Sequence, residues 1–292
     1  MIDRSEAPAH PALPEELRIA YGGDLWFPPS RPERPHVIGN FVSTLDGVVS
    51  YEMAGKSGGG DISGFDPADR FIMGLLRASA DAVMMGSGTL QETAPEHLFV
   101  ADRVYPEARE LYARYRSEIL RKKAPPLHVI VSGSGRMDLS RAVFRTPGIQ
   151  TLIVTTKAGG EFLAAGGAGS LVSTEVRLFE GPHIAPASIL ELLRGEFGVS
   201  LLLHEGGPTL FGKFLADGCV DELFLTIAPQ VAGREMPPPR PGFVAGVGFT
   251  PDSAPWLELV SVKQMGSHLY LRYGGKSAAP VALGKPRGPQ AG

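Results

Sequence analysis

Short apolar runs alternate with helix-like segments along most of this chain. The runs are rich in Val, Ile and Leu, which fit the half-buried surface of a sheet, so they predict strands. The predicted strands are His36–Ser43, Asp81–Met85, Leu127–Ser132, Thr151–Thr155, Glu175–Phe179, Ser200–Leu203, Leu223–Ala228, Leu257–Gln264 and His268–Arg272. Only Met265-Gly266-Ser267 separates the last two, which predicts an antiparallel hairpin.

Helical segments lie between these strands. The clearest begins at Asp66-Pro67, because an aspartate can cap the first turn and a proline fits the first helical position. Apolar residues then recur from Phe71 to Leu76 at the spacing of one helix face. The other predicted helices are Pro106–Lys123, with a charged and solvated face, a Gly/Ala-rich stretch after Thr155, Pro186–Phe197 and Thr209–Ala216.

Strands that alternate with helices and then follow one another directly are typical of an α/β fold. We therefore predict a mostly parallel sheet flanked by helices, with antiparallel strands at its C-terminal edge. The 26 prolines are most densely spaced near the ends of the chain. They divide it into a proline-rich N-terminal extension (1–35), which we expect on the surface or partly disordered, one domain (36–273) and a flexible tail (274–292).

Composition and charge exclude several classes of protein. The 28 basic and 31 acidic residues give a net charge of −3, so we expect no nucleic acid or anionic membrane as partner. The single cysteine excludes a disulfide framework and a cysteine-based metal site, and the histidines lack metal-ligand spacing. No apolar run approaches the roughly 18 residues of a membrane span, and residues 1–20 do not resemble a signal peptide. These features predict a soluble cytoplasmic protein without a bound metal.

Two glycine-rich turns carry the strongest hint of chemistry. Met85-Gly86-Ser87-Gly88-Thr89 and His204-Glu205-Gly206-Gly207-Pro208-Thr209 each lead from a predicted strand into a helix. The carboxyl ends of parallel strands share one edge of a sheet, so the two turns should converge there. Glycine lets the backbone approach a phosphate, and the following helix supplies free N–H groups. The alternative, that these glycines only serve tight turns, stays open.

Related nucleotide-binding and catalytic motifs do not fit. A dinucleotide fingerprint fails at Gln91, where a third glycine should stand. A Walker A loop fails at Phe214, where a hydroxyl group must bind magnesium. The zinc signature of nucleobase deaminases is not found in the chain.

Two carboxylates directly follow predicted strands at the same edge. Asp46 precedes Gly47, and Glu205 precedes the second glycine turn. A carboxylate in such a place can accept hydrogen bonds from a heterocycle or orient a proton donor. Capping of the local turn is the alternative for both residues.

Several of these motifs form one ordered series. It consists of Ser43-Thr44-Leu45-Asp46-Gly47, Ile62-Ser63-Gly64, Asp69-Arg70, Leu76-Arg77-Ala78, Ala80-Asp81-Ala82-Val83, Gly86-Ser87-Gly88-Thr89-Leu90, Glu205-Gly206-Gly207-Pro208-Thr209-Leu210 and Val220-Asp221-Glu222-Leu223 with Ile227-Ala228-Pro229. From about His36 to Tyr273 the chain thus resembles the pyrimidine reductase of riboflavin biosynthesis. That reductase is the C-terminal domain of a bifunctional deaminase/reductase and has a dihydrofolate-reductase-like fold.

The resemblance implies NADPH as hydride donor, a ribosylaminopyrimidine phosphate as substrate and a homodimer formed through the C-terminal strands. The implied cofactor contacts are Ser43, Gly86, Gly88, Thr89, Thr93, Ser132, Gly206, Gly207, Pro208, Thr209, Leu210, Phe211, Gly212 and Lys213. The implied substrate contacts are Asn40, Asp46 and Glu205, with Glu205 on the substrate ring and Asp46 in a positioning role. Asp46 and Glu205 are also the candidate catalytic residues.

The chain departs from the family pattern in two places. Asn40 stands where bacterial bifunctional enzymes commonly carry a lysine, and Gln91–His97 replaces a stretch with an arginine that helps to hold the sugar phosphate. Two alternatives therefore stay open. One is a reductase of dihydrofolate or another pteridine, and the other is a non-catalytic nucleotide-binding homologue.

Overall fold

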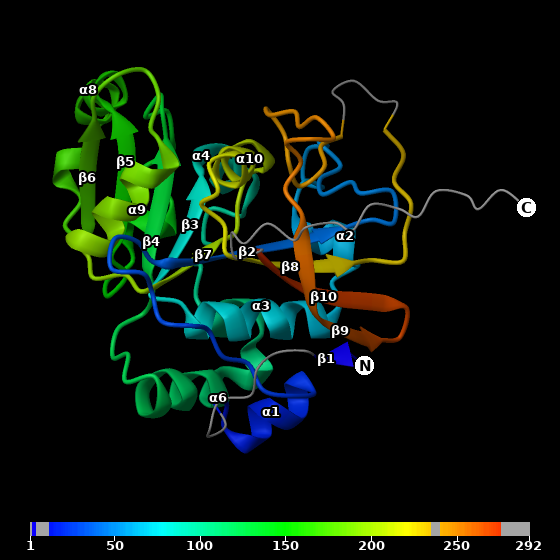
Figure 1. Cartoon of the computed structure of the whole chain (residues 1–292). Helices are drawn as coiled ribbons and strands as arrows, with labels where there is room; N and C mark the ends of the chain where they lie inside the picture. The colour runs from blue at the N-terminus through cyan, green and yellow to red at the C-terminus, as the bar shows by residue number, and fades with distance from the viewer. Residues whose placement is uncertain (1, 4–11, 235–239, 276–292) are drawn as a thin grey trace, which may run out of the picture.

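A twisted ten-stranded sheet forms the centre of the computed structural model, which describes residues 2–3, 12–234 and 240–275 (Figure 1). Its strands are β1 (Ile2–Asp3), β2 (His36–Ser43), β3 (Ala82–Gly86), β4 (Leu127–Ser132), β5 (Thr151–Thr156), β6 (Thr174–Phe179), β7 (Leu201–His204), β8 (Glu222–Ile227), β9 (Leu257–Met265) and β10 (His268–Gly275). They lie side by side in the order β1-β9-β10-β8-β2-β7-β3-β4-β5-β6.

The strands from β8 to β6 in this order run parallel, and β10, β9 and β1 add antiparallel pairs at one edge. This arrangement confirms the predicted α/β class with antiparallel C-terminal strands. The predicted hairpin is also confirmed, since Met265 pairs with His268. Strand β7 lies between β2 and β3, so the chain order changes direction there, as at the ligand-binding crevice of open α/β sheets.

Helices cover both faces of the sheet. They are α1 (Glu15–Tyr21), α2 (Gly59–Ser63), α3 (Pro67–Ser79), α4 (Ser87–Glu92), α5 (Ala101–Val104), α6 (Arg109–Arg114), α7 (Ala142–Arg145), α8 (Lys157–Ala165), α9 (Pro186–Gly195) and α10 (Pro208–Ala216). Because alternate side chains of a strand point to opposite faces, Val83 and Met85 join one apolar cluster, whereas Ala82 and Met84 join the other. The first cluster contains residues of α1, α3 and α6, and the second contains residues of α9 and α10.

The start of α3 follows its local sequence. The Asp66 side chain accepts the Asp69 N–H, and Pro67 occupies the first turn, as predicted. The predicted helix Pro106–Lys123 was wrong in its extent and in its regularity. A 3₁₀ turn (Pro106–Ala108), α6 and a π-helical turn (Tyr115–Ile119) replace it. Tyr112 and Tyr115 are buried, and the Tyr112 hydroxyl donates to the Phe71 carbonyl, so tertiary packing sets the shape of this segment.

The ends of the chain are described only in part. Within the proline-rich stretch, α1 buries Leu17 and Tyr21 against the first apolar cluster. Of the predicted tail, residues 274–275 end β10 and the remainder lies outside the described residues. The division into extension, domain and tail stays a prediction. Among the helices of the described ranges, none has the length and apolar character needed to span a membrane.

Candidate active site

The two glycine-rich turns meet at the carboxyl edge of β3 and β7, which are parallel neighbours. A Cβ atom built on Gly206 would lie 2.8 Å from the Met85 Cβ and 3.1 Å from the Thr89 Cγ2. A Cβ on Gly207 would lie 3.1 Å from the Thr89 hydroxyl oxygen. The turns therefore pack directly on each other, and this close approach requires glycine at position 206.

Helix α10 begins at this contact, next to α4 (Figure 1). Gly207 has φ +67°, which favours glycine, and Pro208 occupies the first helical turn, where its missing N–H costs nothing. No side chain of the described residues caps this end. In the other turn, a Cβ on Gly88 would meet no atom within 4 Å, so the backbone there can be approached. Free N–H groups beside open backbone suit a phosphate.

Two further candidate cofactor residues border these turns. The Ser87 hydroxyl donates to the Ser132 hydroxyl at 3.1 Å, which links the end of β4 to the start of α4. The Thr93 hydroxyl donates to the Leu90 carbonyl, while the Thr93 carbonyl accepts from Arg141. Ser132 thus lies at the candidate phosphate edge, whereas Thr93 closes the far end of α4.

The implied cofactor contacts from Gly206 to Lys213 lie in two different environments along α10. Gly206 to Leu210 lie at the edge or on the first turn of the helix. Phe211 is fully buried, and a Cβ on Gly212 would lie 2.6 Å from the Ala245 carbonyl oxygen. The structure therefore brings the first part of the segment to the edge, while Phe211 and Gly212 pack inside and Lys213 is exposed.

Glu205 forms a buried ion pair with Arg77 of α3. Arg77 Nε donates to Glu205 Oε1 at 2.8 Å, and Arg77 Nη2 donates to Oε2 at 2.7 Å. Their side chains are 4% and 7% exposed, so both charges are removed from water and depend on each other. The Arg77 guanidinium also lies over the Phe99 ring. Sequence reasoning missed Arg77 as a site residue, although a lone arginine between Leu76 and Ala78 on an apolar helix face was a usable signal.

Asp46 is bound by its own loop and by the segment after β8. The Thr44 hydroxyl donates to Asp46 Oδ1 at 2.5 Å, and the backbone N–H groups of Ala232 and Gly233 donate to its two carboxylate oxygens. These hydrogen bonds, that of Thr44 foremost, lower the Asp46 pKa to about 2. Asp46 is therefore ionised at neutral pH and cannot supply a proton there.

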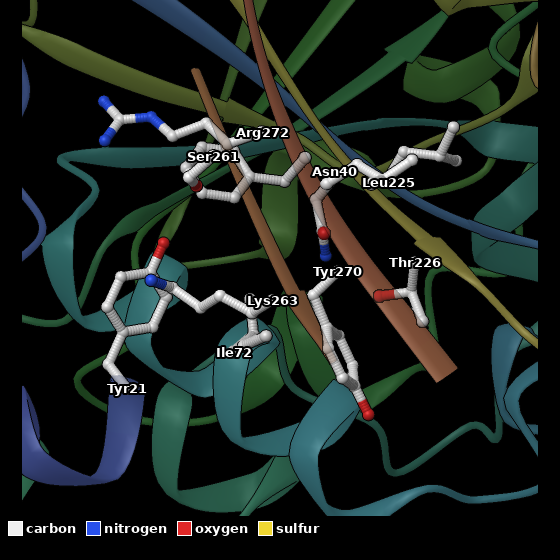
Figure 2. Close-up of a pocket in the computed structure, with 11 residues that line it drawn as sticks. Tyr21, Asn40, Ile72, Leu225, Thr226, Ser261, Lys263, Tyr270 and Arg272 are labelled. Carbon is white, nitrogen blue, oxygen red and sulfur yellow. The ribbon is translucent and has the colours of Figure 1, made fainter. Parts of the chain in front are cut away.

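Asn40 and Ser43 occupy different sides of the end of β2. Gly39 and Phe41 face Phe211 of α10, so Asn40 points to the opposite face of the sheet. There it lines a small pocket with Thr226 and Tyr270 (Figure 2). Ser43 is buried at the strand end, where its hydroxyl donates to the Thr44 carbonyl. Asn40 is thus not brought alongside the glycine turns.

The described residues contain no cluster of three or more His, Cys, Asp or Glu side chains that could hold a metal. The chemistry that this edge can support is instead binding of an anionic, phosphate-bearing ligand beside a carboxylate. The Arg77–Glu205 pair provides that carboxylate in a defined orientation.

Comparison with known proteins finds a matching family model and several relatives with similar names. The family model described as the RibD C-terminal domain matches residues 35–271. A 2,5-diamino-6-ribosylamino-4(3H)-pyrimidinone 5′-phosphate reductase from Archaeoglobus fulgidus is 27% identical over 205 residues, which cover 70% of this chain and 85% of the relative. The riboflavin biosynthesis protein RibD of Aquifex aeolicus is also 27% identical and matches 70% of this chain, which spans about half (49%) of that relative.

Solved structures share the fold. A pyrimidine reductase-like protein from Corynebacterium diphtheriae aligns with a TM-score of 0.64 at 19% identity, covering 89% of this chain and 98% of its own. RibD from Acinetobacter baumannii aligns with a TM-score of 0.59 at 20% identity, covering 84% and 58% of the two chains. At these identities the likeness concerns the architecture alone.

Proposed function

This chain belongs to the family of RibD C-terminal domains, and we propose that it is an NADPH-dependent reductase of a ribosylaminopyrimidine phosphate. The observation that carries the proposal is the pair of interlocked glycine turns in front of the uncapped α10. The name of the Archaeoglobus relative supports the substrate class. A cytoplasmic location is part of the proposal and rests on composition and charge.

The residues at the edge fit a dinucleotide phosphate. A phosphate oxygen can accept from the free N–H groups at the start of α10, while Gly88 leaves the backbone of the other turn approachable. The Ser87 hydroxyl at the start of α4 and the Ser132 hydroxyl at the end of β4 are hydrogen-bonded to each other and can add further contacts to the phosphate. When bound, NADPH supplies the hydride, so the protein contributes orientation and electrostatics.

The carboxylates would then have different tasks. Glu205 is fixed by Arg77, and each of its oxygens retains a lone pair that can accept an N–H of an aminopyrimidine ring. Asp46 holds the segment after β8 through the backbone of Ala232 and Gly233. In this proposal Glu205 contacts the substrate, and Asp46 positions the loop next to it.

Binding and turnover test the proposal separately. We expect NADPH titration to give saturable nicotinamide fluorescence and a higher unfolding temperature. Glu205→Gln should lower turnover about 100-fold while the NADPH Kd changes less than about threefold. Glu191→Gln, an exposed change on α9, is the matched control. Failure to bind NADPH at millimolar concentration would reject the reductase.

One observation favours a second substrate class. Arg141 lies against the Gln91–His97 stretch, which differs from the family pattern, but its guanidinium donates to the carbonyls of Gln91 and Thr93. A substrate without a sugar phosphate, such as dihydrofolate or another pteridine, is therefore the second candidate. Parallel assays of NADPH oxidation decide between them, since turnover of dihydrofolate alone would reject the ribosylaminopyrimidine. NADPH binding without any turnover would favour a non-catalytic homologue.

A further inference from the structure

We infer that His204 is a positioning residue, which holds the second glycine turn in the shape that presents the start of α10 to a cofactor phosphate. The expected effect on cofactor binding rests on the proposed function, whereas the positioning role itself rests on the contacts of His204. His204 is the last residue of β7 and is completely buried. It immediately precedes Glu205 and the two glycines of the turn.

The His204 imidazole accepts a hydrogen bond from the backbone of the turn. The Gly206 N–H donates to His204 Nδ1 at 3.2 Å. A side-chain acceptor on one residue and an N–H two residues later define the same local ring that aspartate and asparagine form in Asx turns. The bond bends the chain directly after Glu205, whose own N–H still donates to the Met84 carbonyl of β3. The sheet hydrogen bonds therefore end at the Glu205 N–H, and the next N–H, that of Gly206, is bound by the His204 side chain.

Aromatic packing fixes the ring plane. Phe211 and Phe214 lie on consecutive turns of α10, and both meet the imidazole edge-to-face, with centroids 5.2 Å and 5.0 Å away. The ring thereby joins the end of β7 to the interior face of α10. Movement of the imidazole would shift both the Gly206 N–H and the helix that follows it.

The protonation state follows from the same contacts. Because Nδ1 accepts the Gly206 N–H, the neutral ring carries its proton on Nε2. Complete burial lowers the His204 pKa to about 3, so the ring stays neutral at physiological pH. Within the described residues Nε2 has no hydrogen-bond partner. An apolar side chain would fill this space without an unpaired N–H, so the Gly206 bond is the distinct contribution of histidine.

Three variants of the full chain test the role. His204→Leu removes the acceptor, and we expect the NADPH Kd to rise about tenfold while kcat at saturating NADPH changes little. His204→Asn restores an acceptor at the position of Nδ1, so its Kd should return to within about threefold of the wild type. Phe214→Leu loosens the same cluster but keeps the acceptor. It should lower the unfolding midpoint and raise the Kd clearly less than His204→Leu does.

The opposite pattern overturns the inference. An unchanged Kd in His204→Leu, or an equal loss in Phe214→Leu, would reduce His204 to a packing residue. Amide exchange at Gly206, followed by NMR, provides a readout that needs no cofactor and should accelerate in His204→Leu alone. If the wild type does not bind NADPH, the proposed function fails, whereas unaltered Gly206 exchange in His204→Leu refutes the positioning role itself.

Discussion

Three carboxylates near the ends of β2, β7 and β8 lie in three different environments. Asp46 accepts several hydrogen bonds that lower its pKa. Glu205 forms a buried ion pair with Arg77. Asp69, in the first turn of α3, is buried, which raises its pKa to about 6. The hydroxyl groups of Thr226 and Ser63 oppose this rise only in part. Environment rather than residue type decides which carboxyl group can hold a proton near neutral pH.

Asp69 makes stability depend on pH in a defined direction. Its folded pKa of about 6 lies above the ordinary value of 3.8, so the folded state binds the extra proton between these values. Its contribution is complete below about pH 4 and is lost as the pH rises through 6. Asp69→Asn mimics the protonated form. We expect it to raise the free energy of unfolding at pH 8 by up to about 3 kcal/mol and to have little effect at pH 4.

Urea denaturation of both proteins from pH 4 to pH 8 measures this difference. Comparing variant with wild type isolates Asp69 from the other titrating groups that face it, namely Asp66 at the N-cap of α3 and His268 on β10. It also separates Asp69 from His128, whose burial lowers its pKa to about 4 and has the opposite effect on stability. Asp252→Asn, at an exposed position, serves as control. A pH-independent difference between Asp69→Asn and wild type would contradict the assignment.

Sequence alone could indicate these carboxylates but not their partners. Asp46 and Glu205 follow apolar strands, which is visible in the local pattern. The donors to Asp46 from Ala232 and Gly233, and the Arg77 partner of Glu205, are far away in the chain. Only the pairing of β2 with β8 and of β3 with β7 brings them together. The roles that depend on these distant partners could therefore not be predicted from the local sequence.

At the scale of elements, α1 shows how tertiary packing creates structure in a proline-rich stretch. The helix has seven residues, too few for stability on its own. Leu17 is fully buried in the apolar cluster that also contains Leu75 and Tyr115. The Asp24 carboxylate accepts the N–H groups of Ala12, Leu13 and Leu25, which closes the chain around the helix. Residues 12–25 are thus anchored to the core.

Truncation of Leu17 measures this anchoring. We expect Leu17→Ala to lower the free energy of unfolding by about 2–5 kcal/mol, because it leaves a cavity in a packed cluster. Ile19→Ala on the same helix is the matched control, since Ile19 is 72% exposed and should cost less than about 1 kcal/mol. Chemical denaturation compares the two. Equal effects would mean that α1 does not contribute to the cooperative core.

Elements with a strong local pattern were predicted well. The bounds of β2 and β4 match their predicted ranges, and Asp66 and Pro67 start α3 as expected. The short helices α1 and α2 were missed because their few apolar residues show no clear period. The π-helical turn Tyr115–Ile119 was missed because buried Tyr115 is held by distant parts of the core. In these cases tertiary contacts override local propensity.

At the scale of the whole molecule, both edges of the sheet carry exposed large apolar side chains. Strand β6 forms one edge, and the hairpin of β9 and β10 lies towards the other, next to the two-residue β1 (Figure 1). Trp256, just before β9, is 75% exposed, and Met265 and Leu269, beside the hairpin turn, are 58% and 36% exposed. We propose that the C-terminal strands form a homodimer, in which a second chain would cover these exposed apolar side chains.

Mass measurement tests this proposal. At micromolar concentration, sedimentation should give twice the mass of one chain, and Met265→Glu combined with Trp256→Glu should shift it to a single chain, because charges oppose burial of this surface. Leu178→Glu is the matched control, since Leu178 is 56% exposed on β6 at the opposite edge. A wild-type protein with the mass of one chain would refute the dimer, and dissociation by Leu178→Glu alone would move the interface to β6. Retained NADPH affinity in the dissociated variant would further show that the phosphate edge at α4 and α10 is complete within one chain.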